Sequence, residues 1–117
     1  MASSACQVIA EIRYGSDVSF DAANMMDIAL RECAEAMLAP LGPAYVDMRG
    51  TGDDFGFVAQ VLAWDEGLMR EVCRSLAGHM DPQASGRLVA VPDGLGAVRV
   101  WRFTAQSMVE DSVAEEV

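Results

Sequence analysis

Residues 55–77, FGFVAQVLAWDEGLMREVCRSLA, decide the fold, because they pass from a strand-like run directly into an amphipathic helix. Over residues 55–64 both alternating sets of side chains are largely apolar, as in a strand inside a sheet. Asp65 then supplies a side-chain oxygen that can accept the free amide hydrogens of a first helical turn. Apolar residues recur at helical spacing up to Ala77. We therefore predict a strand followed at once by a helix.

The strand–helix–strand order occurs twice in the chain. The predicted elements are strand 8–14, helix 21–41, strand 45–49, strand 55–64, helix 65–77, strand 87–91 and strand 97–103. Two βαβ units joined by a hairpin are the ferredoxin-like arrangement. The predicted fold class is therefore α+β: a ferredoxin-like βαββαβ sandwich with two helices on one face of an antiparallel sheet. The run at 97–103 follows the loop 92–96 and adds an extra C-terminal β-hairpin strand.

The first helix has recognisable ends and one apolar stripe. Ser19 or Asp21 is placed to cap its N-terminus, and Pro40 and Gly42 are placed to end it. We expect the stripe to face the sheet, because its members recur at intervals of three and four residues. These members are Ala22, Met26, Ala29, Leu30, Cys33, Met37 and Leu41.

Length and charge define the domain organisation. The 117 residues correspond to one domain, which we assign to residues 1–106, with an acidic C-terminal tail at 107–117. Ser107 and Glu110 have the spacing of a capping box, so the tail is predicted either to begin a short helix or to fray. The net charge is −10, and such an acidic chain is not expected to bind a nucleic-acid backbone.

Neither a membrane location nor an oxidising compartment is expected. No apolar run reaches the ~20 residues that a membrane helix needs, and the first residues do not resemble a signal peptide. The cysteines, Cys6, Cys33 and Cys73, are odd in number and lack the spacing of a zinc site or a disulfide framework. A cytoplasmic location is therefore predicted. Cys33 and Cys73 fall on apolar stripes and are expected to be inert core thiols, whereas Cys6 is expected to be the most exposed.

The face of the sheet away from the helices is predicted to be apolar. Ile9 lies on it, and the last strand adds either Trp101 with Phe103 or Val98 with Val100. An exposed apolar face on a small domain marks an interface, and a homodimer packed sheet to sheet would cover it. The residues assigned to a ligand site or interface are Ile9, Phe57, Trp64, Trp101 and Phe103. The charged residues expected to frame them are Glu11, Arg13, Arg99 and Arg102.

Catalytic chemistry has few candidates in this sequence. A single histidine, His79, cannot form a multi-histidine metal site, and Asp53 with Asp54 lack the further oxygen ligands of a calcium loop. The common phosphate-loop, nucleophile-elbow and zinc-protease motifs are absent from the sequence. No metal and no cofactor is therefore expected. The candidate catalytic residues are His79, Tyr14, Arg99 and Arg102.

These observations favour a non-enzymatic protein, namely a dimeric binding or regulatory module for a protein partner or a small effector. Two other functions stay open. One is a cofactor-independent enzyme, a dimeric α+β barrel acting on an apolar or aromatic small molecule, because such a site needs only a pocket and a few polar groups. The other is an acidic antagonist, such as an immunity protein or a nucleic-acid mimic, that neutralises a basic partner.

Overall fold

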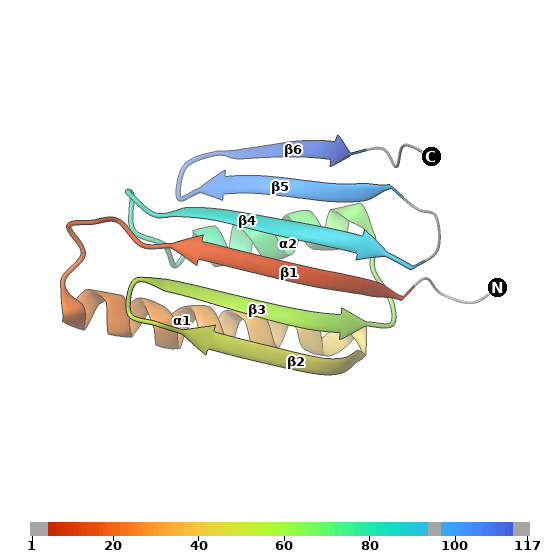
Figure 1. Cartoon of the computed structure of the whole chain (residues 1–117), viewed down its shortest axis with the longest axis horizontal. Coiled ribbons are helices and arrows are strands. Elements are labelled where there is room, and N and C mark those ends of the chain that lie inside the picture. The colour runs from red at the N-terminus through yellow and green to blue at the C-terminus, as the bar shows by residue number, and fades with distance from the viewer. Residues whose placement is uncertain (1–4, 94–96, 114–117) are drawn as a thin grey trace.

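A computed structural model of the chain describes residues 5–93 and 97–113 (Figure 1). Within these residues the chain forms two α-helices, one short 3₁₀ helix and six β-strands, which confirms the α+β class. In chain order the elements are β1 (Cys6–Arg13), α1 (Phe20–Leu38), η1 (Ala39–Leu41), β2 (Pro43–Gly50), β3 (Asp54–Val61), α2 (Glu66–Ala77), β4 (Ser85–Pro92), β5 (Val98–Thr104) and β6 (Met108–Val113).

The strands form one antiparallel sheet in the order β2-β3-β1-β4-β5-β6. Strand β1 lies inside this sheet and pairs along its whole length with β3 on one side and with β4 on the other. Both α-helices lie behind the sheet in the view of Figure 1, α1 behind β2 and β3, and α2 behind β4 and reaching β5. None of the described helices covers the opposite face, which we call the open face.

Side-chain hydrogen bonds cap the start of both α-helices, and a proline changes the last turn of α1. Ser19 Oγ accepts a hydrogen bond from the amide of Ala22 at 3.1 Å, and Asp65 Oδ1 accepts one from the amide of Leu68 at 2.8 Å. Ser19, rather than Asp21, is thus the cap of α1. The last predicted turn of this helix is the 3₁₀ helix η1, because Pro40 has no amide hydrogen to continue the α-helical pattern. Neither of the described α-helices has the length and apolarity that a membrane crossing requires.

Strand β3 ends three residues earlier than predicted, at Val61. The amides of Leu62 and Ala63 both donate to the carbonyl oxygen of Leu41, at 3.1 and 3.2 Å, instead of continuing a strand ladder. These bonds attach the end of β3 to the chain that leaves α1.

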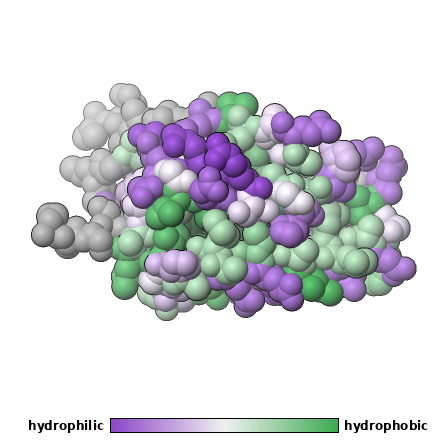
Figure 2. All heavy atoms as spheres, turned by 180° about the vertical axis from the view of Figure 1, so that it is seen from behind, coloured by the Kyte–Doolittle hydropathy of each residue, from purple (hydrophilic) through white to green (hydrophobic). Residues whose placement is uncertain are grey.

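The core lies between the helices and the covered face of the sheet, and α1 and η1 meet it with most of the predicted stripe: Met26, Leu30 and Leu41 are buried, and Cys33 and Met37 pack against the core. Of the other stripe members, Ala22 is exposed and Ala29 is only half-buried. The helix has apolar residues on several sides, so apolar spacing alone did not define its rotation. Figure 2 shows apolar residues on the surface where α1 runs, in the lower half of the helix-bearing side. The buried residues of α1 are Ala23, Met26, Leu30, Ala34 and Leu38.

The acidic C-terminal segment forms a strand over Met108–Val113, and the short helix or frayed tail predicted there is wrong for these residues. Ser107, the expected helix cap, instead belongs to the turn between β5 and β6. Its carbonyl oxygen accepts from the amide of Thr104 at 2.8 Å, and its amide donates to Thr104 Oγ1 at 3.1 Å. Strand β6 then pairs with β5, whose backbone groups on the side away from β4 would otherwise lack a ladder partner. The predicted loop 92–96 lies partly outside the described residues.

A network of ion pairs fastens β5 and β6 to α2. Glu110 on β6 lies 2.9 Å from Arg70 on α2 and 3.3 Å from Arg99 on β5. Arg99 also pairs with Glu66 at the start of α2. The Glu110 side chain is about three-quarters buried, so these contacts are screened less by water than ordinary surface pairs.

A glycine on β4 makes room for an aromatic ring on β5. Gly86 is the cross-strand partner of Phe103, and a Cβ atom at position 86 would lie 2.5 Å from Cε2 of that ring. The ring of Phe103 is buried and therefore covers the glycine backbone. The absence of a side chain at this position thus allows β4 and β5 to pack under α2.

We predict that Gly86→Ala lowers the free energy of unfolding by about 1–3 kcal/mol, because Phe103 must move within a packed core. Urea unfolding followed by circular dichroism measures the change. The matched control is Gly78→Ala, at a residue with φ of −63° and no Cβ contact below 3.4 Å. The control is expected to leave stability unchanged or to raise it by about 0.4–1 kcal/mol. Equal losses in the two variants would contradict the assignment of this contact.

We also predict that Glu110→Gln lowers the free energy of unfolding by about 1 kcal/mol, because it removes the carboxylate that Arg70 and Arg99 share. The control is Glu71→Gln, whose exposed pair with Arg74 should contribute less than about 0.5 kcal/mol. Urea unfolding at low and high salt compares them. An effect no larger than that of the control would show that the network does not hold β6 in place.

Candidate functional site on the open face of the sheet

An apolar row crosses the open face. Val58 on β3, Ile9 on β1, Val89 on β4 and Val100 on β5 lie directly opposite one another in consecutive strand pairs. Side chains in such pairs touch, so the row is continuous across four strands. Ile9 is 37% exposed, and the three valines are partly exposed. This apolar row is the feature that the sequence predicted for the second face of the sheet.

A charged row lies beside the apolar row, two residues further along each strand. From β2 to β5 it contains Arg49, Gly56, Glu11, Arg87 and Arg102. Gly56 has no side chain, so the surface is lower at this point than at its neighbours. Charged and apolar groups thus occupy adjacent strips of one surface.

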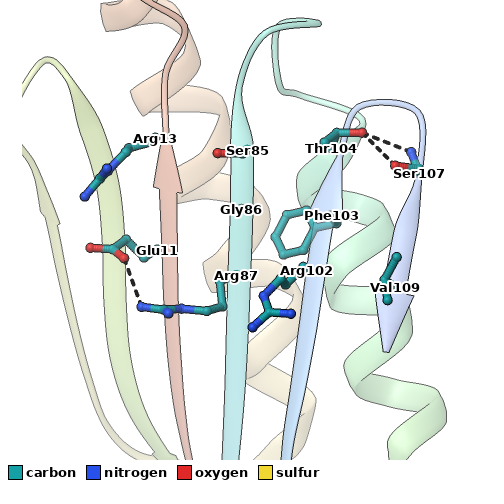
Figure 3. A pocket seen from close by; sticks show the side chains of 10 residues that line it. All are labelled: Glu11, Arg13, Ser85, Gly86, Arg87, Arg102, Phe103, Thr104, Ser107 and Val109. Atoms are coloured by element: carbon teal, nitrogen blue, oxygen red, sulfur yellow. Dashed lines mark hydrogen bonds and ion pairs between the residues drawn. The ribbon is translucent and has the colours of Figure 1, made fainter. Parts of the chain in front are cut away.

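Two hollows of about 460 and 490 Å³ occupy this face within the described residues. The first, which we call the arginine hollow, is lined by Arg13, Arg87 and Arg102 together with Glu11 and Ser85 (Figure 3). The second, the apolar hollow, has Ile9, Val58, Val89 and Gly56 in its lining. Arg87 and Glu11 line both hollows, and their ion pair at 3.4 Å forms the ridge between them.

The structure places the predicted interface residues on two different sides of the sheet. Ile9 lies on the open face as expected. Phe57, Trp101 and Phe103 lie in the core instead, 2%, 0% and 3% exposed, and Trp64 packs against that core from the β3–α2 connection. Four of the five residues assigned to the interface are therefore part of the core or packed against it.

The register of β5 explains this correction. Trp101 is paired with Leu88, and Leu88 is fully buried. Because alternate residues point to opposite faces, Val98 and Val100 take the open face. Of the two sets that the sequence left open for this face, the smaller one, Val98 with Val100, is thus the set that points away from the helices. Arg99 shares the covered side with Trp101, whereas Glu11, Arg13 and Arg102 do lie on the open face.

The predicted catalytic residues are not brought together. His79 is exposed after the end of α2, whereas Arg99 pairs with Glu66 at its beginning. Arg102 lies on the opposite face of the sheet. Tyr14 follows β1, and burial raises the pKa of its hydroxyl to about 12, with the nearby Asp27 and Asp54 carboxylates adding to the rise. No acid–base pair is formed among these four residues.

Sequence reasoning missed the contribution of β4 to this surface. Arg87 and Val89 alternate with the buried Leu88 and Ala90, and this period-two pattern is visible in the sequence. The pattern predicts a half-buried strand, but it does not say which strands lie on either side. The pairing of Arg87 with both Glu11 and Arg102 could be recognised only from the register.

The cysteines are free thiols without a metal-binding arrangement. Cys6 is fully buried, so the prediction that it is the most exposed thiol is wrong: its side chain is the first core residue of β1. Burial raises the pKa of Cys6 to about 11, and burial together with the Glu110 carboxylate raises that of Cys73 to about 12. Burial also raises the pKa of Cys33. Among the described residues, His, Cys, Asp and Glu side chains form no group of three or more that could hold a metal ion.

Comparison of the chain with protein-family models, with curated proteins and with solved structures gives no match.

We predict that Cys6 and Cys73 resist a thiol-labelling reagent in the folded protein at pH 8, because the reactive thiolate form is suppressed and the side chains are buried. Cys33, which is partly exposed, is expected to react slowly. Mass spectrometry after labelling counts the modified thiols, and all three should react in denaturant.

The same raised pKa values predict a dependence of stability on pH. The thiols of Cys6 and Cys73 lose their protons near pH 9 when unfolded but near pH 11–12 when folded. The contribution of these protonated thiols to the free energy of unfolding is therefore complete below about pH 9 and is lost as the pH rises toward 12.

In the labelling experiment, rapid modification of Cys6 in the native protein would contradict its burial.

Proposed function

We propose that the protein is a non-enzymatic, dimeric binding module whose working surface is the open face of the sheet. In this proposal a second copy of the chain packs its apolar row against that of the first. The neighbouring charged row lies at the border of the dimer interface and is available to a small effector. The apolar row that no described helix covers is the observation that carries the proposal.

The extent of the face supports a second copy as the occupant. Strands spaced about 4.8 Å apart and rising about 3.3 Å per residue make a face of about 24 by 26 Å, or roughly 600 Å² in projection. The accessible surface is larger because side chains project from it, so the whole face, apolar and charged rows together, approaches the ~800 Å² per partner of a standard interface, and a contact confined to the apolar row is smaller. A two-fold arrangement needs one surface that is complementary to itself, and an apolar row meets this requirement.

We also propose that residues 6–92 form a ferredoxin-like unit to which β5 and β6 are appended. The neighbours β2-β3-β1-β4 have the order that two interlocking βαβ units produce, and this order supports the assignment. The two helices on one side of the sheet agree with it. In this interpretation β5 and β6 make the open face wider than that of the ferredoxin-like unit alone.

The proposal predicts that Ile9→Glu converts the dimer into a monomer, because it places a carboxylate in the centre of the apolar row. Sedimentation velocity at ~100 μM measures the change, and circular dichroism verifies the fold. The matched control is Ile28→Glu, which introduces the same charge at an isoleucine that is 50% exposed on α1. The control is expected to remain dimeric.

Two results would overturn this assignment. A wild-type protein that sediments as a monomer at ~100 μM would remove the dimer. A dimer that survives Ile9→Glu but is broken by Ile28→Glu would place the interface on α1 instead of the sheet.

Capture of a basic protein in a salt-sensitive manner by the monomeric protein would favour an acidic antagonist.

A further inference from the structure

Two arginines face each other across β4 and β5 on the open face. Arg87 and Arg102 are directly opposed in the register. The Cβ atoms of such a pair lie about 4.5–5.5 Å apart, and like charges in this position destabilise a sheet. Within the protein Arg87 also pairs with Glu11, and Arg102 has an interaction of its own. The pair therefore places two positive charges side by side on this part of the open face.

The surroundings of the pair concentrate positive charge. The arginine hollow has three guanidinium groups, those of Arg13, Arg87 and Arg102, against one carboxylate, that of Glu11. The whole chain, in contrast, has a net charge of −10. A volume of about 460 Å³ lies within the range of small-molecule sites. The hollow is thus a local basic site of suitable size on an acidic protein.

The arginines that line the hollow differ in how their charges are balanced. The guanidinium group of Arg13 has no hydrogen-bond or ion-pair partner within residues 5–93 and 97–113, and its cross-strand neighbour on β3 is Asp54. Arg87 has an exposed pair with Glu11 at 3.4 Å, and exposed pairs contribute little, so an anion can replace Glu11 at low cost.

Ser85 supplies a hydroxyl group at the edge of the arginine hollow. It is the cross-strand partner of Arg13 on β1 and of Thr104 on β5. The hydroxyls of Thr104 and Ser107 interact within the β5–β6 turn, at 3.1 Å from each other. In the described part of the chain the Ser85 hydroxyl has no such partner, so it is available as a donor.

We infer that the arginine hollow binds the oxyanion of a small molecule, a carboxylate or a phosphate group, through Arg13, Arg87 and Ser85. A guanidinium group donates paired hydrogen bonds that match the oxygens of either group. Arg102 has an interaction of its own and contributes its positive charge. The inference rests on the proposed role of the open face as a binding surface, and it names the chemical class of the effector.

The side-chain directions are compatible with this site. Figure 3 shows that Arg87 extends across β1 toward Glu11, that Arg13 leans the same way, and that Arg102 lies over the space between β4 and β5. Both Arg13 and Arg87 lie at exposed positions and are diagonal neighbours across β1 and β4, a separation that long side chains span.

The test is a titration of the full chain with inorganic phosphate and, separately, with citrate, followed by backbone amide NMR shifts at low salt. Sodium chloride at matched ionic strength corrects for non-specific screening. We expect saturable shifts centred on residues 85–87, and at least tenfold weaker binding in the double variant Arg13→Gln, Arg87→Gln. The control Arg74→Gln, on the exposed side of α2, should bind as the wild type does.

Tighter binding of phosphate than of citrate would identify a phosphate-bearing effector, and the reverse order would identify a carboxylate. Absence of saturable binding of both anions would overturn the inference, and so would equal affinity in the double variant. Amide spectra establish that each variant is folded, so a loss of binding cannot be confused with unfolding.

Sedimentation of the same samples separates this inference from the proposed dimer. A dimer that binds neither anion would overturn the anion site and leave the dimer intact. A monomer that binds an anion through Arg13 and Arg87 would overturn the dimer and leave the anion site intact.

Discussion

The pairing of β1 on both sides along its whole length is the constraint on which the rest of the structure depends. Side chains alternate between faces with a period of two, so the register of β1 determines at once which residues of β3 and β4 face the helices. Val8, Ala10 and Ile12 point into the core as a consequence. A slip of one residue would bring Glu11 and Arg13 beneath the helices, and the cost of burying these charges excludes it.

This register also gives the two faces of the sheet different chemical properties. The covered face holds the large side chains, such as Trp101, Phe55 and Phe57, which fill the space under the helices. The open face has smaller apolar groups in one row and charged groups in the next. A dimer interface and an anion site can therefore adjoin on one surface, because each uses a different row of the same strands.

Much of the fold could be predicted from local patterns, whereas the site could be predicted only in part. Helix α2 begins at its expected cap, Asp65, and the strand alternation of β1 is as predicted. Both sets of alternate residues on β5 contain apolar side chains, so the sequence leaves either Trp101 with Phe103 or Val98 with Val100 for the open face, and size alone does not choose between them. Likewise Ser107 can cap a helix or close a turn. It closes a turn here because the residues after it pair with β5 as a strand.

The sequence by itself determined the order of helices and strands, the helix caps and the two alternating sets within each strand, because these depend on residues close together in the chain. Only the tertiary structure decided which set faces the helices, that β6 completes the sheet, and that Arg87 lies between Glu11 and Arg102. These features depend on pairing between strands that are distant in sequence. Their register follows from burying the largest apolar surface, which no single strand defines alone.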